Sequence, residues 1–252
     1  MNEFTFPAEI VELPSKGLLY NESNILSSGK IEMKYMTAKE EDILTNSNYI
    51  KQGIVIDKLL QSMIISKIEF NDLLTCDKDA ILIAARVLGY GKDYQISYPH
   101  PKTGEYEDVM VDLTKLKEKP LDESLLLKPK LNEFKFILPN TNNEVTFRLL
   151  SQHDEQNIDA ELKGLKKIDP ISNPELTTRL KYMLLSVNGN YEKKTIREFV
   201  DNGLLARDSR ALREYVNKIT PGVEMKYTHI FNDGVEEDII VPIGVEFFWP
   251  EY

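Results

Sequence analysis

The composition of the chain excludes several classes of protein. It has 252 residues, of which 42% are hydrophobic and 29% charged, and a formal net charge of −10 at pH 7. Such a charge disfavours binding to nucleic-acid phosphates and to anionic membranes, and no apolar run approaches the roughly 20 residues that cross a bilayer. The start of the chain lacks a basic segment followed by an apolar one, so we expect a soluble intracellular protein without a signal peptide.

The first half predicts a strand followed by helices. Apolar and polar residues alternate over residues 31–35, which is the period of a strand. Thr37 and Glu40 then have the spacing of a capping box, so a helix is expected to begin there. Residues 56–64 and 73–82 have apolar residues at helical spacing and predict two further helices.

A turn and a β-hairpin complete this half. Gly89 or Gly91 is expected to end the preceding helix, because glycine readily adopts a positive φ. Residues 94–113 then alternate on both sides of a turn that contains Gly104, a pattern typical of a hairpin.

The second half repeats this order. The corresponding segments are a strand at 145–149, a helix start at Ser151-x-x-Asp154, helices at 178–187 and 204–213, and a hairpin at 223–243 whose turn contains Gly234. We interpret the repeat as an internal duplication, with chance similarity as the alternative. The sequence therefore predicts an α+β protein of two similar lobes, residues 1–120 and 131–252, joined by a linker at 121–130.

The last residues of the chain are unusually aromatic. Phe247, Phe248, Trp249 and Tyr252 lie within its final six positions. Alternation over residues 239–247 predicts a strand that pins the terminus, with one large aromatic side chain buried in the lobe. The remaining aromatic residues are candidates for partner binding, because such side chains commonly anchor interfaces.

Three arginines form a second candidate binding surface. Arg207, Arg210 and Arg213 recur three positions apart in a predicted helix and would bind an acidic partner. Pairing with Asp208 and Glu214 on the same helix is an equally good interpretation.

The sequence contains no motif for catalysis, a cofactor or a metal ion. Phosphate-binding loops, nucleophile elbows and the His-Glu-x-x-His motif are all absent. Cys76, the single cysteine, would be a nucleophile only beside a histidine, and we interpret it as an inert thiol. His100, His153 and His229 lack the accompanying ligands of a metal site, so we predict neither a metal nor a cofactor.

Four segments together resemble a known family. They read LPSKGLLY (residues 13–20), GKIEMKYMTAKEEDIL (29–44), DSRALREYVNKITPGVEM (208–225) and FFWP (247–250). This ordered set resembles the baseplate hub and hub-assembly proteins of T-even-type contractile-tailed bacteriophages, over nearly the whole chain.

The resemblance implies a non-enzymatic, late structural or assembly protein of the tail baseplate hub. Its expected partners are other hub proteins, and its expected locations are the host cytoplasm during assembly and the virion baseplate. The sequence leaves two alternative functions open, a two-lobed intracellular adaptor and an enzyme that uses Cys76. It also leaves open whether the chain forms a homo-oligomer.

The hairpin tips depart from the family pattern. The resemblance associates such tips with Cys-x-x-Cys-Gly, typical of a zinc ribbon, but residues 100–104 and 230–234 here read HPKTG and IFNDG. The glycines remain and the thiolates are absent. We therefore predict hairpins without zinc, held by turn geometry and packing.

Overall fold

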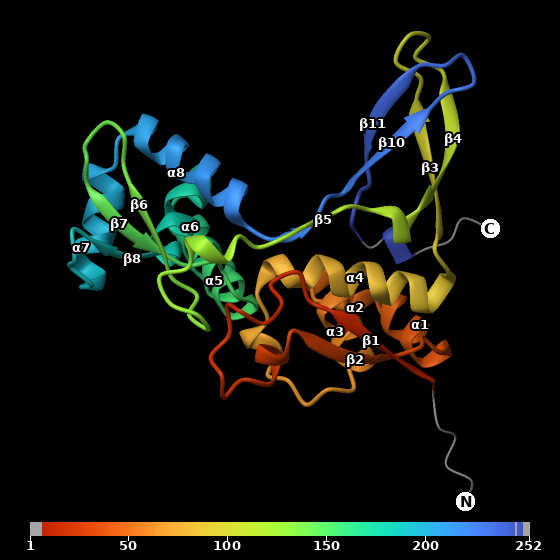
Figure 1. Ribbon diagram of the computed structural model, residues 1–252, viewed down its shortest axis with the longest axis horizontal. Coiled ribbons are helices and arrows are strands. Elements are labelled where there is room, and N and C mark those ends of the chain that lie inside the picture. Colours follow the sequence, from red (N-terminus) through yellow and green to blue (C-terminus); the bar gives the residue numbers. More distant parts are fainter. Residues whose placement is uncertain (1–6, 245, 249–252) are drawn as a thin grey trace, which may run out of the picture.

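Helices and small antiparallel sheets build the protein together. The computed structural model describes residues 7–244 and 246–248. Figure 1 shows an elongated molecule with helices at both ends and two β-hairpins standing side by side above one end. The α+β class predicted from the sequence is confirmed, whereas the internal duplication stays a prediction.

The first half folds around one antiparallel pair of strands and four helices. Its strands are β1 (Ala8–Glu12) and β2 (Lys30–Lys34), and its helices are α1 (Ala38–Leu44), α2 (Ser47–Gln52), α3 (Val55–Met63) and α4 (Thr75–Tyr90). Ile31 and Met33 project from β2 into a core shared with Leu59 and Leu60 of α3, all nearly fully buried. The predicted strand and the helices at 56–64 and 73–82 are confirmed.

The second half contains a three-stranded sheet and four helices. The sheet pairs β6 (Phe134–Ile137), β7 (Glu144–Phe147) and β8 (Leu184–Val187) in that order, and the helices are α5 (Gln152–Ile168), α6 (Glu175–Met183), α7 (Lys193–Glu198) and α8 (Ala206–Ile219). Phe134 and Phe147 stack at 5.5 Å inside this half, and Tyr215 of α8 packs edge-on against Phe147.

Both predicted hairpins are confirmed. They consist of β3 (Asp93–Pro99) with β4 (Tyr106–Asp112), and of β10 (Lys226–Ile230) with β11 (Glu236–Ile240). Gly104 and Gly234 occupy the turns at φ values of 72° and 82°, and Gly91, which ends α4, has a φ of 86°. These positive values explain why glycine stands at each position.

The two halves are connected by more than the chain between them. β5 (Glu118–Lys119) pairs with β9 (Gly222–Val223), and the second hairpin lies beside the first (Figure 1). Leu74 and Ser151 form an isolated antiparallel bridge, with Thr75 N donating to Leu150 O at 3.0 Å and Gln152 N to Leu73 O at 2.7 Å. The starts of α4 and α5 are therefore held together by backbone hydrogen bonds.

Two predictions of secondary structure are wrong. The helix predicted at 178–187 ends at Met183, because residues 184–187 become β8 and pair with β7. The strand predicted over 239–247 ends at Ile240, and residues 246–248 form a 3-10 turn. Pro242 has no backbone N–H to donate to a ladder, which accounts for the end of the strand.

One local arrangement occurs in both halves. Asp77 and Asp208 are each the third residue of a helix, α4 or α8, and each is fully buried. Asp77 accepts hydrogen bonds from Ser15 N, Ser15 Oγ and Tyr20 Oη at 2.6–2.9 Å. Asp208 accepts four, from the backbone and side chains of Asn140 and Thr141, at 2.8–3.1 Å. In each half a buried carboxylate thus joins a helix to the loop between the first two strands, which supports the predicted duplication.

Candidate partner-binding site

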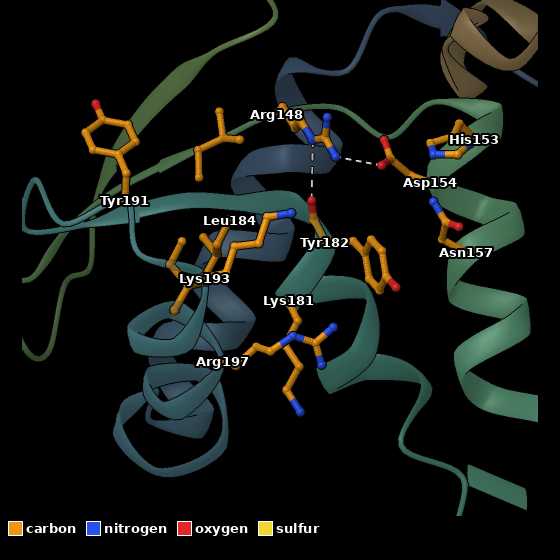
Figure 2. A pocket seen from close by; sticks show the side chains of 12 residues that line it. Arg148, His153, Asp154, Asn157, Lys181, Tyr182, Leu184, Tyr191, Lys193 and Arg197 are labelled. Carbon is orange, nitrogen blue, oxygen red and sulfur yellow. Dashed lines mark hydrogen bonds and ion pairs between the residues drawn. The ribbon is translucent and has the colours of Figure 1, made fainter. Parts of the chain in front are cut away.

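A basic pocket lies in the second half of the molecule. It has a volume of about 470 Å³, and Figure 2 shows its lining side chains. The walls come from the end of β7, the first turn of α5, the end of α6, β8 and α7. The lining residues are Arg148, His153, Asp154, Asn157, Lys181, Tyr182, Leu184, Leu185, Tyr191, Lys193, Ile196 and Arg197.

Arg148 is held in place where β7 gives way to α5. Ser151 and Asp154 form the predicted capping box, so Asp154 is fixed in the first turn of the helix. Arg148 Nη2 donates to Asp154 Oδ1 at 2.6 Å, and Arg148 Nε donates to the Tyr182 carbonyl at 3.4 Å (Figure 2). Because both contacts restrain the guanidinium, little side-chain entropy is left to lose when it binds a ligand.

Arg197 is fixed from another side by Glu161 of α5. Its Nη1 and Nη2 donate to the two carboxylate oxygens of Glu161 at 3.0 and 2.9 Å, a bidentate pair. The hydrogen bonds from Arg197 lower the pKa of Glu161 in spite of its partial burial. Tyr182 Oη also donates to Glu161 at 3.0 Å, and the Arg197 guanidinium lies 5.9 Å from the Tyr182 ring centroid.

The charges that line the pocket are mostly positive. The lining contains one carboxylate, Asp154, and four cationic side chains, which are Arg148, Lys181, Lys193 and Arg197. Lys181 pairs with Asp201 at 2.7 Å, outside the lining, whereas Lys193 is exposed and forms no ion pair within the described parts of the chain. In a chain with a net charge of −10, the lining of this pocket is a local concentration of cationic side chains.

The sequence does not predict this pocket. Its cations come from a strand end, a helix end and a short helix that lie far apart in the chain, so no local motif reveals them. The only sequence signal was the capping box at Ser151 and Asp154, which fixes one acidic wall.

The predicted arginine surface lies on the exposed side of α8. Arg207, Arg210 and Arg213 are all exposed. Arg210 Nε donates to Glu214 Oε1 at 2.8 Å, as the alternative interpretation expected, and Arg213 Nε donates to the Ser209 carbonyl at 3.3 Å. The expected pairing with Asp208 is wrong, because that carboxylate is buried against the β6–β7 loop.

The terminal phenylalanines are packed inside the chain. Phe247 is 1% and Phe248 0% exposed, so two aromatic side chains are buried where the sequence predicted one. Phe247 contacts Tyr94 of β3 edge-on at 5.0 Å, and the two phenylalanine rings lie 5.4 Å apart. Trp249 and Tyr252 lie outside the described residues. Partner binding by these four aromatic residues stays a prediction.

Cys76 lacks the surroundings of a catalytic nucleophile. It is buried near the start of α4, and burial raises the pKa of its thiol, which disfavours the reactive thiolate. No hydrogen bond connects it to a histidine in the described structure. Residues 7–244 and 246–248 also contain no group of three or more His, Cys, Asp or Glu side chains able to hold a metal ion.

The hairpin tips contact each other through polar and aromatic side chains. His100 Nε2 lies 3.4 Å from Asp233 Oδ1, and Lys102 Nζ lies 3.0 Å from Asp233 Oδ2. His100 also contacts Phe231 edge-on at 4.6 Å. The hydrogen bond from Lys102 is the main cause that lowers the pKa of Asp233 to about 2. These contacts join the two turns directly.

Comparison with known proteins identifies one family. A family model described as T4 bacteriophage base plate protein matches residues 19–249. Neither the curated proteins nor the solved structures contain a significant match. Among the described helices, none has the length and apolar character needed to span a membrane.

Proposed function

The chain belongs to the T4 bacteriophage base plate protein family, and on this premise we propose that it is a structural or assembly protein of the central hub of the baseplate. The match over residues 19–249 carries the proposal, since it covers most of the chain. The four segments that resemble hub and hub-assembly proteins extend through the same region and support the narrower assignment to the hub.

The proposed activity is binding rather than catalysis. The surroundings of Cys76 support this, because a buried thiol with a raised pKa is a poor nucleophile. In the proposal, the chain binds other hub proteins through Arg207, Arg210 and Arg213, the three exposed arginines of α8. Trp249 and Tyr252 are further proposed contacts, and residues 1–120 and 131–252 are proposed as its two lobes.

Affinity purification from infected cells tests this proposal. A tagged copy of the chain, produced during infection by the phage that encodes it, is expected to co-purify with hub proteins of the baseplate. Co-purification with sheath or capsid proteins alone would contradict a hub role. An unrelated tagged phage protein of similar size and charge is the control.

The same infection separates a virion component from a transient assembly factor. Peptides of the chain in purified particles, in a fixed ratio to hub proteins, would identify a component. Peptides in the lysate together with their absence from particles would identify an assembly factor that acts in the host cytoplasm. A homo-oligomer would be seen as untagged copies that co-purify with the tagged chain.

A further inference from the structure

The basic pocket between β7, α5, β8 and α7 points to a specific kind of partner. We infer that the pocket binds a short, acidic segment of another protein. Carboxylate groups of that segment would contact the cations of the pocket, and an apolar side chain would contact its apolar lining residues. This inference rests on the proposed function, since it gives the chemistry of one partner contact.

The two arginines of the pocket retain hydrogen-bond donors for a ligand. Arg148 uses Nε and Nη2 in contacts within the chain, and Arg197 uses Nη1 and Nη2 on Glu161. A guanidinium has five N–H donors, so both arginines retain donors for a ligand while their positions are fixed. Lys193 adds a cation that forms no ion pair in the described structure.

The lining of the pocket combines apolar, aromatic and cationic side chains. Leu184 and Ile196 line the pocket as buried apolar side chains, and Tyr191, which also lines it, is 62% exposed. Exposed tyrosines are typical interface anchors, because the ring offers apolar contact area and the hydroxyl a hydrogen bond. A partner segment that alternates carboxylates with apolar side chains fits this lining better than a purely charged one.

The size of the pocket and the net charge of the chain favour a protein segment over a nucleic acid as the ligand. A volume of about 470 Å³ accommodates a few side chains. A nucleic acid would need a continuous basic surface along its backbone, and the chain as a whole carries −10. A short acidic segment carries few negative charges, so the net negative charge of the chain repels it only weakly. The attraction to the cations of the pocket can then exceed this repulsion.

A direct binding experiment uses the full chain and a labelled peptide. Fluorescence anisotropy would follow the fluorescein-labelled peptide EELEEL, with its uncharged analogue QQLQQL and a single-stranded oligothymidine as comparison probes. We expect the acidic peptide to bind more tightly than both, with an affinity that falls as salt is added. Absence of binding at low ionic strength, or preference for the oligothymidine, would overturn the inference.

Two adjacent lysines of α7 provide a matched pair of variants. Lys193 lines the pocket, whereas Lys194 is exposed on the same helix and does not line it. K193E is expected to weaken peptide binding about tenfold, because it places a carboxylate among the ligand's own. K194E makes the same change in net charge and should alter the affinity less than about twofold. Equal losses of peptide affinity in both variants would show that the peptide responds to the overall charge of the chain, and would overturn the inferred binding in the pocket.

Failure of the pocket and failure of the hub function can be told apart. If K193E weakens peptide binding about tenfold and the tagged variant loses one hub partner that K194E retains, both proposals are supported. If the wild-type chain co-purifies with the hub but does not bind the peptide, only the inference about the pocket fails. If the peptide binds but no hub protein co-purifies, the hub function fails and the pocket remains.

Discussion

At the scale of single residues, buried carboxylates show how neighbouring donors keep a charge inside the protein. Glu40 is completely buried, and burial alone would raise its pKa. Hydrogen bonds from Lys34, Ser62 and Thr37 outweigh that effect and lower the pKa to about 2, from an ordinary value of 4.5. The ionised side chain therefore stabilises the fold at neutral pH, and protonation removes that contribution.

The first prediction concerns the substitution E40Q. It is expected to lower the free energy of unfolding at pH 7 by about 2–3 kcal/mol, because a neutral amide with an N–H₂ group replaces a buried carboxylate that accepts hydrogen bonds from Lys34, Thr37 and Ser62. Since the folded pKa lies below the unfolded one, the stabilisation is complete above pH 4.5 and disappears as the pH falls towards 2.

Urea unfolding at several pH values between 7 and 2 measures this difference. Wild type and E40Q should converge in stability as the pH falls through that interval. E12Q is the control, because Glu12 pairs with Lys30 on the surface, with 73% of its side chain exposed, and should have little effect. A pH-independent gap between wild type and E40Q would contradict the prediction.

The second prediction concerns Cys76, which is 7% exposed with a raised thiol pKa. A thiol-specific chromogenic reagent should react with the native chain far more slowly than with the chain in denaturant, because reaction needs an accessible thiolate. C76A should also retain all partner binding. Rapid, stoichiometric labelling of native protein would instead favour the enzyme alternative.

At the scale of elements, the helix starts of α4 and α8 differ in how they accommodate a buried aspartate. Burial raises the pKa of Asp77, even though Tyr20 and Ser15 donate hydrogen bonds to it. Burial would also raise the pKa of Asp208, but the hydrogen bonds from Asn140 and Thr141 outweigh this effect, so the pKa is lowered. The negative charge is therefore better stabilised at α8 than at α4.

The third prediction compares the two sites. D208N is expected to lower the thermal midpoint more than D77N at pH 7, because the amide at α8 places an N–H₂ group against two of the four donors that Asp208 satisfies. At α4 the amide removes a charge whose burial is unfavourable. Calorimetry of both variants decides this, and a larger loss in D77N would contradict it.

The fourth prediction concerns the exposed arginines of α8. R207A/R210A/R213A should keep the wild-type thermal midpoint, because the buried side of the helix is formed by Leu212, Val216 and Ile219. It should reduce co-purification with hub proteins. K163A/K166A/K167A on α5 removes the same charge and is the control. Unchanged recovery of hub proteins by the arginine variant would exclude that surface.

Sequence patterns predicted elements better than they predicted the site. Capping boxes and glycine turns depend on neighbouring residues, and for this reason the helix starts at Thr37 and Ser151 and both hairpins are confirmed. The pattern of residues 184–187 predicts a helix and misses their pairing with β7, because that pairing involves residues about forty positions away. The cations of the basic pocket likewise come from separate elements, so no local motif predicts them.

At the scale of the whole molecule, two halves with similar helix starts are connected by paired strands and by hairpins that meet at their tips. The backbone bridge between Leu74 and Ser151 and the pairing of β5 with β9 both cross between the halves. A chain held together in this way presents several surfaces in fixed relative positions. That property suits a protein that brings others together, and the family match indicates a phage baseplate as the setting.

Under the proposed function, the baseplate hub is not built without this chain. Deletion of its gene from the phage that encodes it, followed by electron microscopy of the infected lysate, tests this requirement. We expect lysates without hub-containing baseplates, and their restoration when the wild-type chain is supplied from a plasmid. Complete, infectious tails assembled without the chain would contradict it.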